Sequence, residues 1–408
     1  MGAFRILSLP LMGFGSFLSE SWTAFRGETP HSEVPPLEAS VGAVLEAVLD
    51  RSFTLGVNLM AGVPNPADIR RAHEAMKLAA DTIEDQGWLL NPAAFHRIPP
   101  PLSDVEETEH TGFQFLRRVH YKQVRFDSGY HAHPSLEGER WRDFTSNRDG
   151  YAYILEHEDK PDRPWIVCIH GFSMGDATSN FAAFDAHRLH HELGLNVLMP
   201  VLPLHGPRAG GRASGGEIIT TDYVNMIHFF AQALWDIRRL IGWLRRGGAN
   251  QIGVWGISMG GYTSALLAGF DGDLECVIAG VPPTDFPNVA RDNLPWIMGT
   301  YERDLSTDWR DVRRMMHPVS PLTFDPLVPK DRRFIYAGIA DRVVRPDQAR
   351  ALWRRWGQPE IQWFSGGHVA MQMRSGVVDF VEDALCASDM LPNLAEAGEP
   401  GDETEAAS

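Results

Sequence analysis

The sequence places a serine between two glycines in the stretch Gly256-Ile257-Ser258-Met259-Gly260. An apolar run at residues 251–255 precedes it and residues 261–268 follow with a helical pattern, so Ser258 is predicted to stand on a sharp turn from strand to helix. The flanking glycines allow a tight, strained backbone that larger residues would block. Because a serine hydroxyl is a poor nucleophile until a base removes its proton, the motif predicts a histidine and an orienting carboxylate further along the chain.

Two downstream residues meet this requirement. Asp341 follows the apolar run 334–339, and His368 follows the run 361–364 in a glycine-rich loop. Each therefore lies at the carboxyl end of a predicted strand, the edge at which a parallel sheet gathers its reacting groups. We expect His368 to act as the base for Ser258 and Asp341 to hold the imidazole in place.

Other carboxylates compete with Asp341 for the role of the acid. They are Asp271, Asp273 and Asp285, and Asp285 is the strongest of them because it lies just beyond the predicted strand at residues 276–280. Each of the three motifs alone also fits an ordinary turn. Their conjunction, with each motif at the end of its own strand, favours a catalytic set.

Acyl transfer also needs hydrogen-bond donors for the oxyanion that develops in the transition state. The backbone N–H of Met259 is one predicted donor, because it directly follows the serine. The turn after the strand at residues 165–169 supplies the other: Gly171 lets the backbone approach closely, and the N–H of Phe172 is the expected donor. His170, in the same turn, is expected to brace the loop, since the base role is already filled.

Strands and helices alternate from about residue 121 onward. Apolar or alternating runs predict strands at residues 121–126, 151–155, 165–169, 196–200, 251–255, 276–280, 333–338 and 361–364. Helices are expected at about residues 179–193, 223–246, 346–356 and 370–385. This alternation predicts an α/β fold whose sheet is mainly parallel, with helices on both faces.

Residues 1–118 are predicted to form a mostly helical N-terminal extension, which either caps the active site or buttresses the sheet. One helix is expected from Pro66 to about Gln86, because Asn65 can cap it and proline suits the first helical position. Residues 119–388 form the predicted sheet domain.

Two further segments stand apart by composition. Residues 283–329 are rich in Trp and Met but contain no obvious strand, which favours a helical lid over the substrate site rather than a surface insertion. Residues 389–408 carry acidic side chains and no Lys or Arg, so a solvated, disordered tail is expected.

The chain resembles the α/β-hydrolase superfamily over about residues 121–388. The elbow around Ser258, the turn His170-Gly171-Phe172, Asp341 and His368 carry the resemblance, and the chain order Ser, Asp, His is the one this superfamily uses. The turn does not look like the His-Gly-Gly-Gly of one lipase group. A serine at the elbow, where haloalkane dehalogenases and epoxide hydrolases place aspartate, argues against both. The stretch at residues 203–208 is similar to a loop of small esterases and dienelactone-hydrolase-like enzymes.

Composition excludes some functions and compartments. The formal net charge of −16 argues against a nucleic-acid surface, because phosphate binding needs clustered Lys and Arg. Three cysteines form no disulfide framework, which favours a reducing compartment and a cytoplasmic location. Residues 6–18 have the length of a signal-peptide core, but Pro10 and Gly13 interrupt them and no clean cleavage site follows, so a packing or membrane-touching segment is favoured.

Some polar residues are ambiguous. His131 with His133, and the pair His190-His191, have no Cys, Asp or Glu at ligand spacing, so structural histidines are favoured over a metal site. Arg208 and Arg212 lie in a glycine-rich loop, where they could hold an anionic group of a substrate or remain solvated.

The sequence thus predicts a serine hydrolase that cleaves a small-molecule carboxylic ester or thioester through an acyl-enzyme intermediate, with no metal or organic cofactor. An acyltransferase on the same fold is the main alternative, and a non-catalytic binding protein is the weaker one. The sequence leaves the natural substrate, the acyl chain length and the oligomeric state open.

Overall fold

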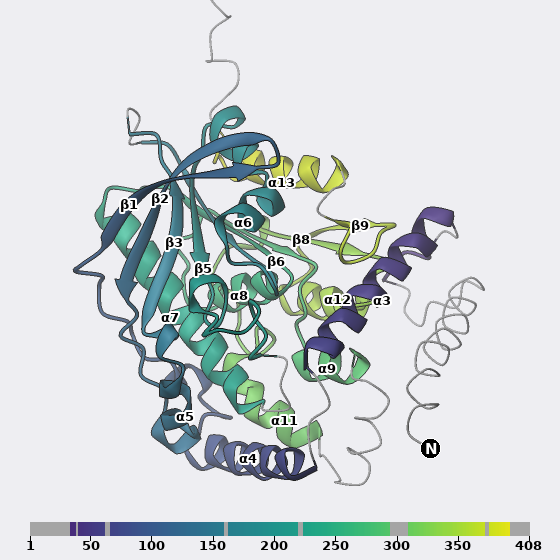
Figure 1. The fold of residues 1–408 in the computed structure, drawn as a ribbon. Coiled ribbons are helices and arrows are strands. Elements are labelled where there is room, and N and C mark those ends of the chain that lie inside the picture. The colour runs from purple at the N-terminus through teal and green to yellow at the C-terminus, as the bar shows by residue number, and fades with distance from the viewer. Residues whose placement is uncertain are drawn as a thin grey trace, which may run out of the picture.

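The computed structural model describes residues 33–37, 40–61, 66–158, 162–218, 223–293, 309–371 and 375–391. These residues form a nine-stranded sheet with helices on both faces (Figure 1). The strands are β1 (Glu106–Gln114), β2 (Arg117–Asp127), β3 (Asp149–Leu155), β4 (Trp165–Ile169), β5 (Asn196–Val201), β6 (Ile252–Ile257), β7 (Cys276–Gly280), β8 (Arg333–Gly338) and β9 (Glu360–Phe364). The helices are α3 (Val41–Ala61), α4 (Pro66–Asp85), α5 (Gly138–Asp143), α6 (Ala177–Phe184), α7 (Val224–Arg246), α8 (Met259–Leu267), α9 (Phe286–Asn293), α11 (Trp309–Met316), α12 (Pro346–Arg355) and α13 (Ser375–Ala387).

The sheet is mainly parallel, as the sequence predicts. Its order is β1-β2-β3-β5-β4-β6-β7-β8-β9. Strands β4 to β9 run parallel to one another. Beyond β5 the sheet continues with β3, β2 and β1, each antiparallel to its neighbour. The chain passes from β4 to β5 on one side and then to β6 on the other. The loops after β4 and β6 therefore diverge, and the carboxyl ends of these strands border the crevice in which such sheets bind ligands.

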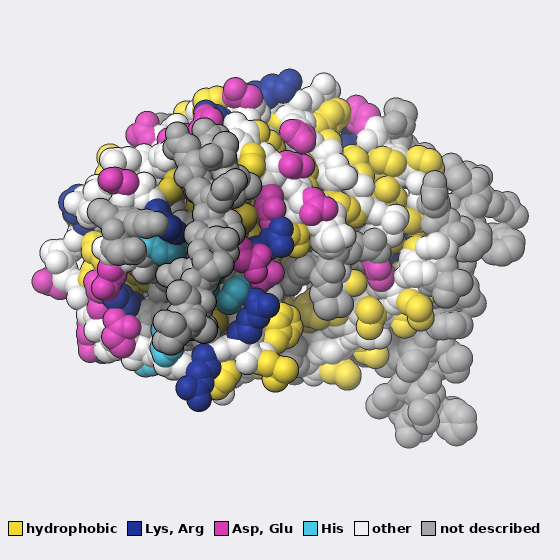
Figure 2. All heavy atoms as spheres, turned by 90° about the horizontal axis from the view of Figure 1, so that it is seen from above, with side chains coloured by type: hydrophobic (Ala, Val, Ile, Leu, Met, Phe, Trp, Pro, Cys, Tyr) yellow, Lys and Arg dark blue, Asp and Glu magenta, His cyan; other side chains and the backbone are white. Residues whose placement is uncertain are grey.

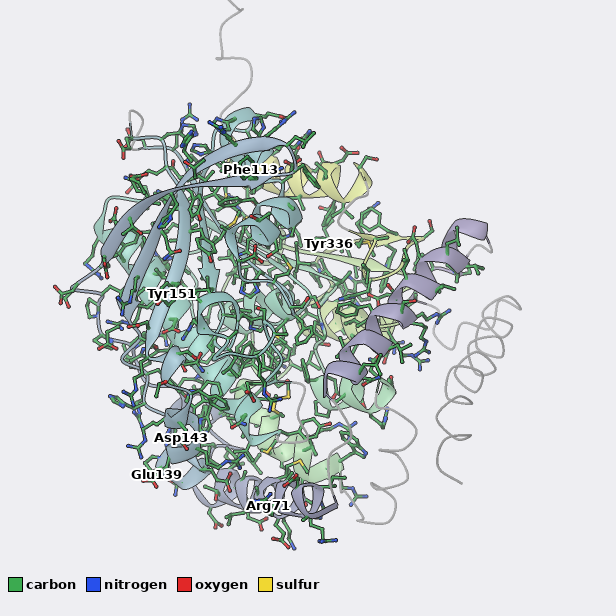
Figure 3. All side chains as sticks on the ribbon, viewed as in Figure 1. Arg71, Phe113, Glu139, Asp143, Tyr151 and Tyr336 are labelled. Carbon is green, nitrogen blue, oxygen red and sulfur yellow. The ribbon has the colours of Figure 1, made fainter. Side chains whose placement is uncertain are left out.

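Two hydrophobic cores lie on opposite faces of the sheet. Successive side chains of a strand point to opposite faces, so Val254 and Val277 join one core while Trp255 and Ile278 join the other. Helices α4, α7, α8, α11 and α12 contribute to the first core, and α6 and α13 to the second. Figure 3 shows Tyr336 of β8 inside the molecule, where its hydroxyl accepts a hydrogen bond of 3.2 Å from Trp255 Nε1. Both faces of the sheet are thus covered.

The surface carries mixed charge. On the face seen in Figure 2, acidic and basic side chains are interspersed. Exposed ion pairs such as Lys122 with Glu158, 2.6 Å apart, contribute only about 0–1 kcal/mol each. The two cores, rather than these pairs, hold the fold together.

The sheet begins earlier than the predicted boundary near residue 118. Strand β1 pairs antiparallel with β2, so residues from 106 onward belong to the sheet and not to a helical extension. The segment EETEHTGFQ has no apolar alternation, because nearly all its side chains are exposed on this outer strand. Hydrophobic periodicity therefore carries no signal for it.

The helix expected over residues 179–193 is broken in two. Helix α6 ends before Asp185, whose φ of 47° is left-handed, and Arg188–Glu192 forms a separate π-helical turn. Gln114 Nε2 donates to Asp185 Oδ1 at 2.6 Å, a long-range contact that the local sequence does not contain. Two other boundaries agree: α4 begins at residue 66 and α7 ends at residue 246, as predicted. The helix expected over residues 370–385 is α13, Ser375–Ala387.

The two described N-terminal helices occupy different places (Figure 1). Helix α4 packs against α11 and α7, with Ala80 and Ile83 fully buried. Helix α3 lies beside β9 and α9, and Asn58 Nδ2 donates to Asn293 O at 3.1 Å. One helix thus reaches the core, whereas the other reaches the side of the molecule where the last parallel strands end.

The predicted lid is described only in part, as α9 and α11. Met315 and Met316 of α11 are buried in the first core. Trp296, Met298 and Tyr301 lie outside the described residues. The lid therefore stays a prediction.

The ends of the chain also lie partly outside the described residues. The N-terminal stretch 6–18 and the acidic residues from 392 onward belong to this part of the sequence. Met390, which the prediction assigned to the tail, is fully buried with its Sδ 3.5 Å from Cys276 Sγ. In the described ranges, no helix combines the length and the apolar character needed to cross a membrane.

Candidate active site

Ser258 stands at the junction of β6 and α8. Its φ of 55° and ψ of −115° lie outside the regions that most residues adopt, and its N–H donates to Gly280 O at 2.8 Å. A Cβ on Gly260 would collide with the carbonyl oxygen of Ile169, and one on Gly256 with the carbonyl oxygen of Gly260. Both glycines of the motif are therefore required by the tight turn and by its close approach to β4.

Ser258, His368 and Asp341 form one hydrogen-bonded chain. His368 Nε2 lies 2.9 Å from Ser258 Oγ, and His368 Nδ1 lies 2.7 Å from Asp341 Oδ2. An ionised carboxylate can only accept, so Nδ1 carries the proton and Nε2 is left to accept the proton of the serine hydroxyl. The loops after β6, β8 and β9 bring together the three residues that the sequence singles out.

The carboxylate of Asp341 is fixed by its own loop. It is 1 % exposed, and its Oδ1 accepts hydrogen bonds from Val343 N at 2.9 Å and Val344 N at 2.7 Å. Its Oδ2 is thereby directed at the imidazole. Asp285, the strongest rival, instead accepts from Asn288 N at 3.1 Å at the start of α9. Asp285 caps a helix, and Asp341 lies beside the histidine.

The surroundings of His368 act on its pKa in opposite directions. Burial lowers the pKa because it disfavours the imidazolium. The charge and hydrogen bond of Asp341 and the charge of Asp50 raise it, and the net shift is upward from the usual value. The site therefore stabilises the imidazolium that forms when His368 takes a proton.

Two backbone amides border the serine. Met259 is the first residue of α8, so its N–H has no acceptor within the helix. Phe172 follows Gly171, where a Cβ would lie 3.5 Å from Ser258 Cβ. Within the described ranges neither amide has a backbone acceptor. Both are available for the oxyanion role that the sequence predicts.

His170 supports the turn that carries Phe172. It is fully buried, its Nε2 accepts from Leu202 N at 3.0 Å, and its Nδ1 therefore donates to Gly171 O at 2.8 Å. Burial lowers the pKa of His170 to about 4, which keeps the ring neutral near pH 7. It braces the loop, as the sequence suggests.

Two side chains at the site come from α3 and are not among the residues predicted from the sequence. Asp50 is fully buried and accepts hydrogen bonds from three backbone N–H groups in the loops that carry Asp341 and His368. The donors are Arg342 at 2.9 Å, His368 at 2.8 Å and Val369 at 3.0 Å. One turn earlier, Glu46 accepts from Gly367 N at 2.7 Å. The sequence feature that could have pointed to Asp50 is its position directly after the apolar run 41–49.

Arg208 is not placed to bind a substrate anion. It is fully buried, and its guanidinium donates to Val201 O at 2.8 Å and to Asp236 Oδ2 at 2.9 Å. The glycine-rich composition of its loop suggested exposure, but the arginine turns inward to an acidic partner on α7. Arg212 pairs with Glu217 at 2.7 Å.

Three of the other ambiguous histidines, His133, His190 and His191, pack against rings. His133 stacks on Phe95 with ring centroids 5.2 Å apart, and His190 stacks on His157 at 3.8 Å. Across the described ranges, no three His, Cys, Asp or Glu side chains come together in a group that could hold a metal ion.

Comparison with known proteins gives a family and a fold. Residues 245–372 match the model of the prolyl oligopeptidase family. The chain is 38 % identical over 393 residues to Uncharacterized protein MT2702 of Mycobacterium tuberculosis (strain CDC 1551 / Oshkosh), covering 94 % of this chain and 91 % of that protein. It is 37 % identical over the same length and coverage to Uncharacterized protein Rv2627c of strain ATCC 25618 / H37Rv.

Two solved structures share the arrangement of strands and helices. Acetyl xylan esterase 1 from Thermoanaerobacterium sp. JW/SL YS485 has a TM-score of 0.52 and 17 % identity, covering 75 % of this chain and 93 % of that one. The acetyl xylan esterase from Paenibacillus sp. R4 has a TM-score of 0.52 and 15 % identity, covering 72 % and 93 %. The chain belongs to the same family as the two Mycobacterium tuberculosis proteins, and its fold is that of the α/β-hydrolase superfamily.

Proposed function

We propose that the protein is a serine hydrolase that cleaves a carboxylic ester or thioester of a small molecule. The observation that carries the proposal is the hydrogen-bonded chain from Ser258 through His368 to Asp341 at the ends of three strands. The strained backbone of the serine supports it, because conformations of this kind cluster at active sites. The match of residues 245–372 to a family of serine-type hydrolases is a second support.

In the proposed catalytic cycle, each of these residues has one role. Ser258 Oγ attacks the acyl carbon as its proton moves to His368 Nε2, and Asp341 stabilises the resulting imidazolium. The N–H groups of Phe172 and Met259 donate to the oxyanion, and one good donor contributes about 3–4 kcal/mol. The imidazolium then protonates the leaving alcohol or thiol as the acyl-enzyme forms. Water then attacks the acyl carbon and loses a proton to the same Nε2, which passes that proton to Ser258 Oγ as the acid leaves. Every proton moves between these groups, so the cycle invokes no metal or organic cofactor.

Two other reactions are compatible with the same nucleophilic serine: cleavage of a peptide bond, and transfer of the acyl group to an acceptor other than water. A peptide bond is a second candidate, because the matching family model is that of the prolyl oligopeptidases and the same triad logic cleaves amides. An acyltransferase would replace water with an alcohol or amine. We assign to residues 283–329 the role of a lid that selects the acyl group and the acceptor.

The test compares substrate classes on one enzyme. p-Nitrophenyl esters of graded acyl length should be hydrolysed, and peptide p-nitroanilides should be turned over more slowly. Ser258→Ala and His368→Ala should each lower kcat by about 10⁴-fold or more while the circular dichroism spectrum is unchanged. Ser103→Ala, an exposed serine, serves as the control.

A fluorophosphonate probe supplies the deciding readout. It should label the wild-type protein at Ser258 and leave Ser258→Ala unlabelled. No labelling of the folded wild-type protein would refute a serine hydrolase. Faster cleavage of anilides than of esters would replace the ester proposal by peptide cleavage, and product partitioning to an added alcohol would replace it by acyl transfer.

A further inference from the structure

We propose that Asp50, on helix α3, is a positioning residue that aligns His368 and Asp341 for their reaction with Ser258. The inference rests on the proposed function and extends the active-site machinery to the N-terminal part of the chain. It makes α3 a component of the site and not only a neighbour of it.

The contacts of the Asp50 carboxylate join both loops that carry the acid and the base. Oδ2 accepts from Arg342 N, next to Asp341, and from the backbone N–H of His368 itself. Oδ1 accepts from Val369 N. A carboxylate that binds three N–H groups in this way needs both of its oxygens as acceptors. One side chain thus links the two loops, in addition to the direct backbone hydrogen bond from Ala340 N to Gly366 O at 3.0 Å.

Other residues on the same face of α3 contact the same loops. Glu46, Asp50 and Phe53 are spaced four and three residues apart, so they lie on one side of the helix. Glu46 accepts a hydrogen bond from Gly367 N, and the rings of Phe53 and Phe172 form a T-shaped pair with centroids 6.4 Å apart. One helix face thus touches the loops of the base, the acid and the predicted oxyanion donor.

The orientation of α3 is the opposite of what hydrophobic packing alone would produce. Its leucines at positions 45, 49 and 55 are 61 %, 51 % and 53 % exposed, while Asp50 is fully buried. A helix held only by apolar contacts turns its leucines inward, and burying a carboxylate is costly unless its partners compensate for the lost water. The buried aspartate therefore points to a role in arranging the loops.

Charge provides a second line of support. The charged groups that face His368 are Asp341, from the loop after β8, and Asp50, from α3, with Glu46 one helical turn away. The charge of Asp50 contributes to the raised pKa of His368. Burial and the charge of Asp341 raise the pKa of Asp50, against the three backbone N–H groups, which lower it. Removing the Asp50 charge should therefore lower the pKa of His368.

The first test is Asp50→Asn, which keeps the shape but leaves one oxygen as acceptor. We expect kcat to fall by about tenfold to a hundredfold, the effect of a misplaced reacting group, with KM little changed. The acidic limb of the profile of kcat/KM against pH should move to lower pH. Ser52→Ala, on the exposed face of α3, and Glu74→Gln, an exposed carboxylate on α4, are the matched controls and should behave as the wild type.

The second readout does not depend on turnover. The pKa of His368 is measured by NMR titration of protein labelled with ¹⁵N-histidine, and His368→Gln assigns its signal. The pKa should be lower in Asp50→Asn than in the wild type. Failure of the proposed function would appear as an unlabelled wild-type serine, whereas failure of this inference would appear as an unmoved His368 pKa.

A second variant disturbs the same contact from the other side. A Cβ on Gly367 would lie 2.8 Å from Asp50 Oδ2, so Gly367→Ala should push the histidine loop away without removing a charge and should also lower kcat. Folded Asp50→Asn with wild-type kcat, or with an unmoved acidic limb, would overturn the proposal, as would an activity loss that only follows the folded fraction. If Asp50→Asn does not fold, wild-type turnover by folded Gly367→Ala would overturn it.

Discussion

At the scale of single residues, the two oxygens of Asp341 have separate tasks. Oδ1 is held by the backbone of its own loop, and Oδ2 accepts the Nδ1 proton of His368. The carboxylate thereby fixes which imidazole nitrogen is left to receive the serine proton. An amide in its place could offer a donor to Nδ1 and select the wrong tautomer.

Asp341→Asn is therefore expected to lower kcat by about 10⁴-fold, as the loss of tautomer control does in triads of this kind. Steady-state kinetics on an activated ester would measure it. Asp285→Asn is the matched control, because asparagine caps a helix as well as aspartate does. Turnover that survives in Asp341→Asn but not in Asp285→Asn would reverse the assignment of the acid.

The pH dependence follows from the raised pKa of His368. The imidazole must be neutral to take the serine proton, so kcat/KM should rise with pH and level off above the pKa of the free enzyme. Because the neighbouring carboxylates outweigh burial, the midpoint should lie above about 6.5, the usual value for histidine. A profile from pH 5 to pH 9 measures it, and a midpoint below the usual value would mean that burial dominates.

Ser258, Asp341 and His368 could be predicted from the sequence because each follows a strand-like apolar run and has a side chain suited to its step. Asp50 could not be predicted, for a physical reason. Its partners are backbone N–H groups, one of which is 292 residues away in the chain. Every residue except proline has a backbone N–H, so residue types do not indicate which of these groups an aspartate will bind. Only the fold shows that Asp50 lies at the site.

At the scale of elements, a buried ion pair ties the loop after β5 to helix α7. Arg208 and Asp236 are both buried, with Nη2 and Oδ2 2.9 Å apart. Burial raises the pKa of Asp236 and lowers that of Arg208, so desolvation outweighs the attraction within the pair. Such a pair stabilises little as a unit, but removing one partner leaves an uncompensated buried charge.

Asp236→Ala is thus expected to lower the free energy of unfolding by about 3–5 kcal/mol. Urea denaturation followed by circular dichroism would measure the change. The control is Arg212→Ala, which breaks the more exposed pair with Glu217 and should cost at most about 1 kcal/mol. Equal losses in the two variants would contradict the distinction between buried and exposed pairs.

The elements that the sequence predicts well are those whose local pattern matches their surroundings. The central strands are buried on both faces and read as continuous apolar runs, as in Trp165–Ile169. Strand β1 has exposed side chains and no such pattern, and the break after α6 depends on Gln114 from that same strand. The errors therefore lie where tertiary contacts, and not local periodicity, decide the structure.

At the scale of the whole molecule, the residues before β1 divide into two parts with different surroundings. Helix α4 joins the first core, with Ala80 and Ile83 fully buried against elements that include α7 and α11. Helix α3 instead carries the Asp50 contact to the active-site loops. The two alternatives for the extension, cap and buttress, stay predictions, and separate deletions of the two helices test them.

Removing residues 1–61 deletes α3 and keeps α4, so the protein should remain folded and lose kcat at least as strongly as Asp50→Asn. Removing residues 1–104 also strips α4 from the core, and each large buried side chain lost costs about 1.5–3 kcal/mol, so this protein should unfold at lower urea or aggregate. Size-exclusion chromatography, urea denaturation and ester kinetics on both proteins separate the effects. Undiminished kcat after the shorter deletion would show that α3 does not contribute to catalysis. Wild-type stability after the longer deletion would show that α4 is not needed to close the core.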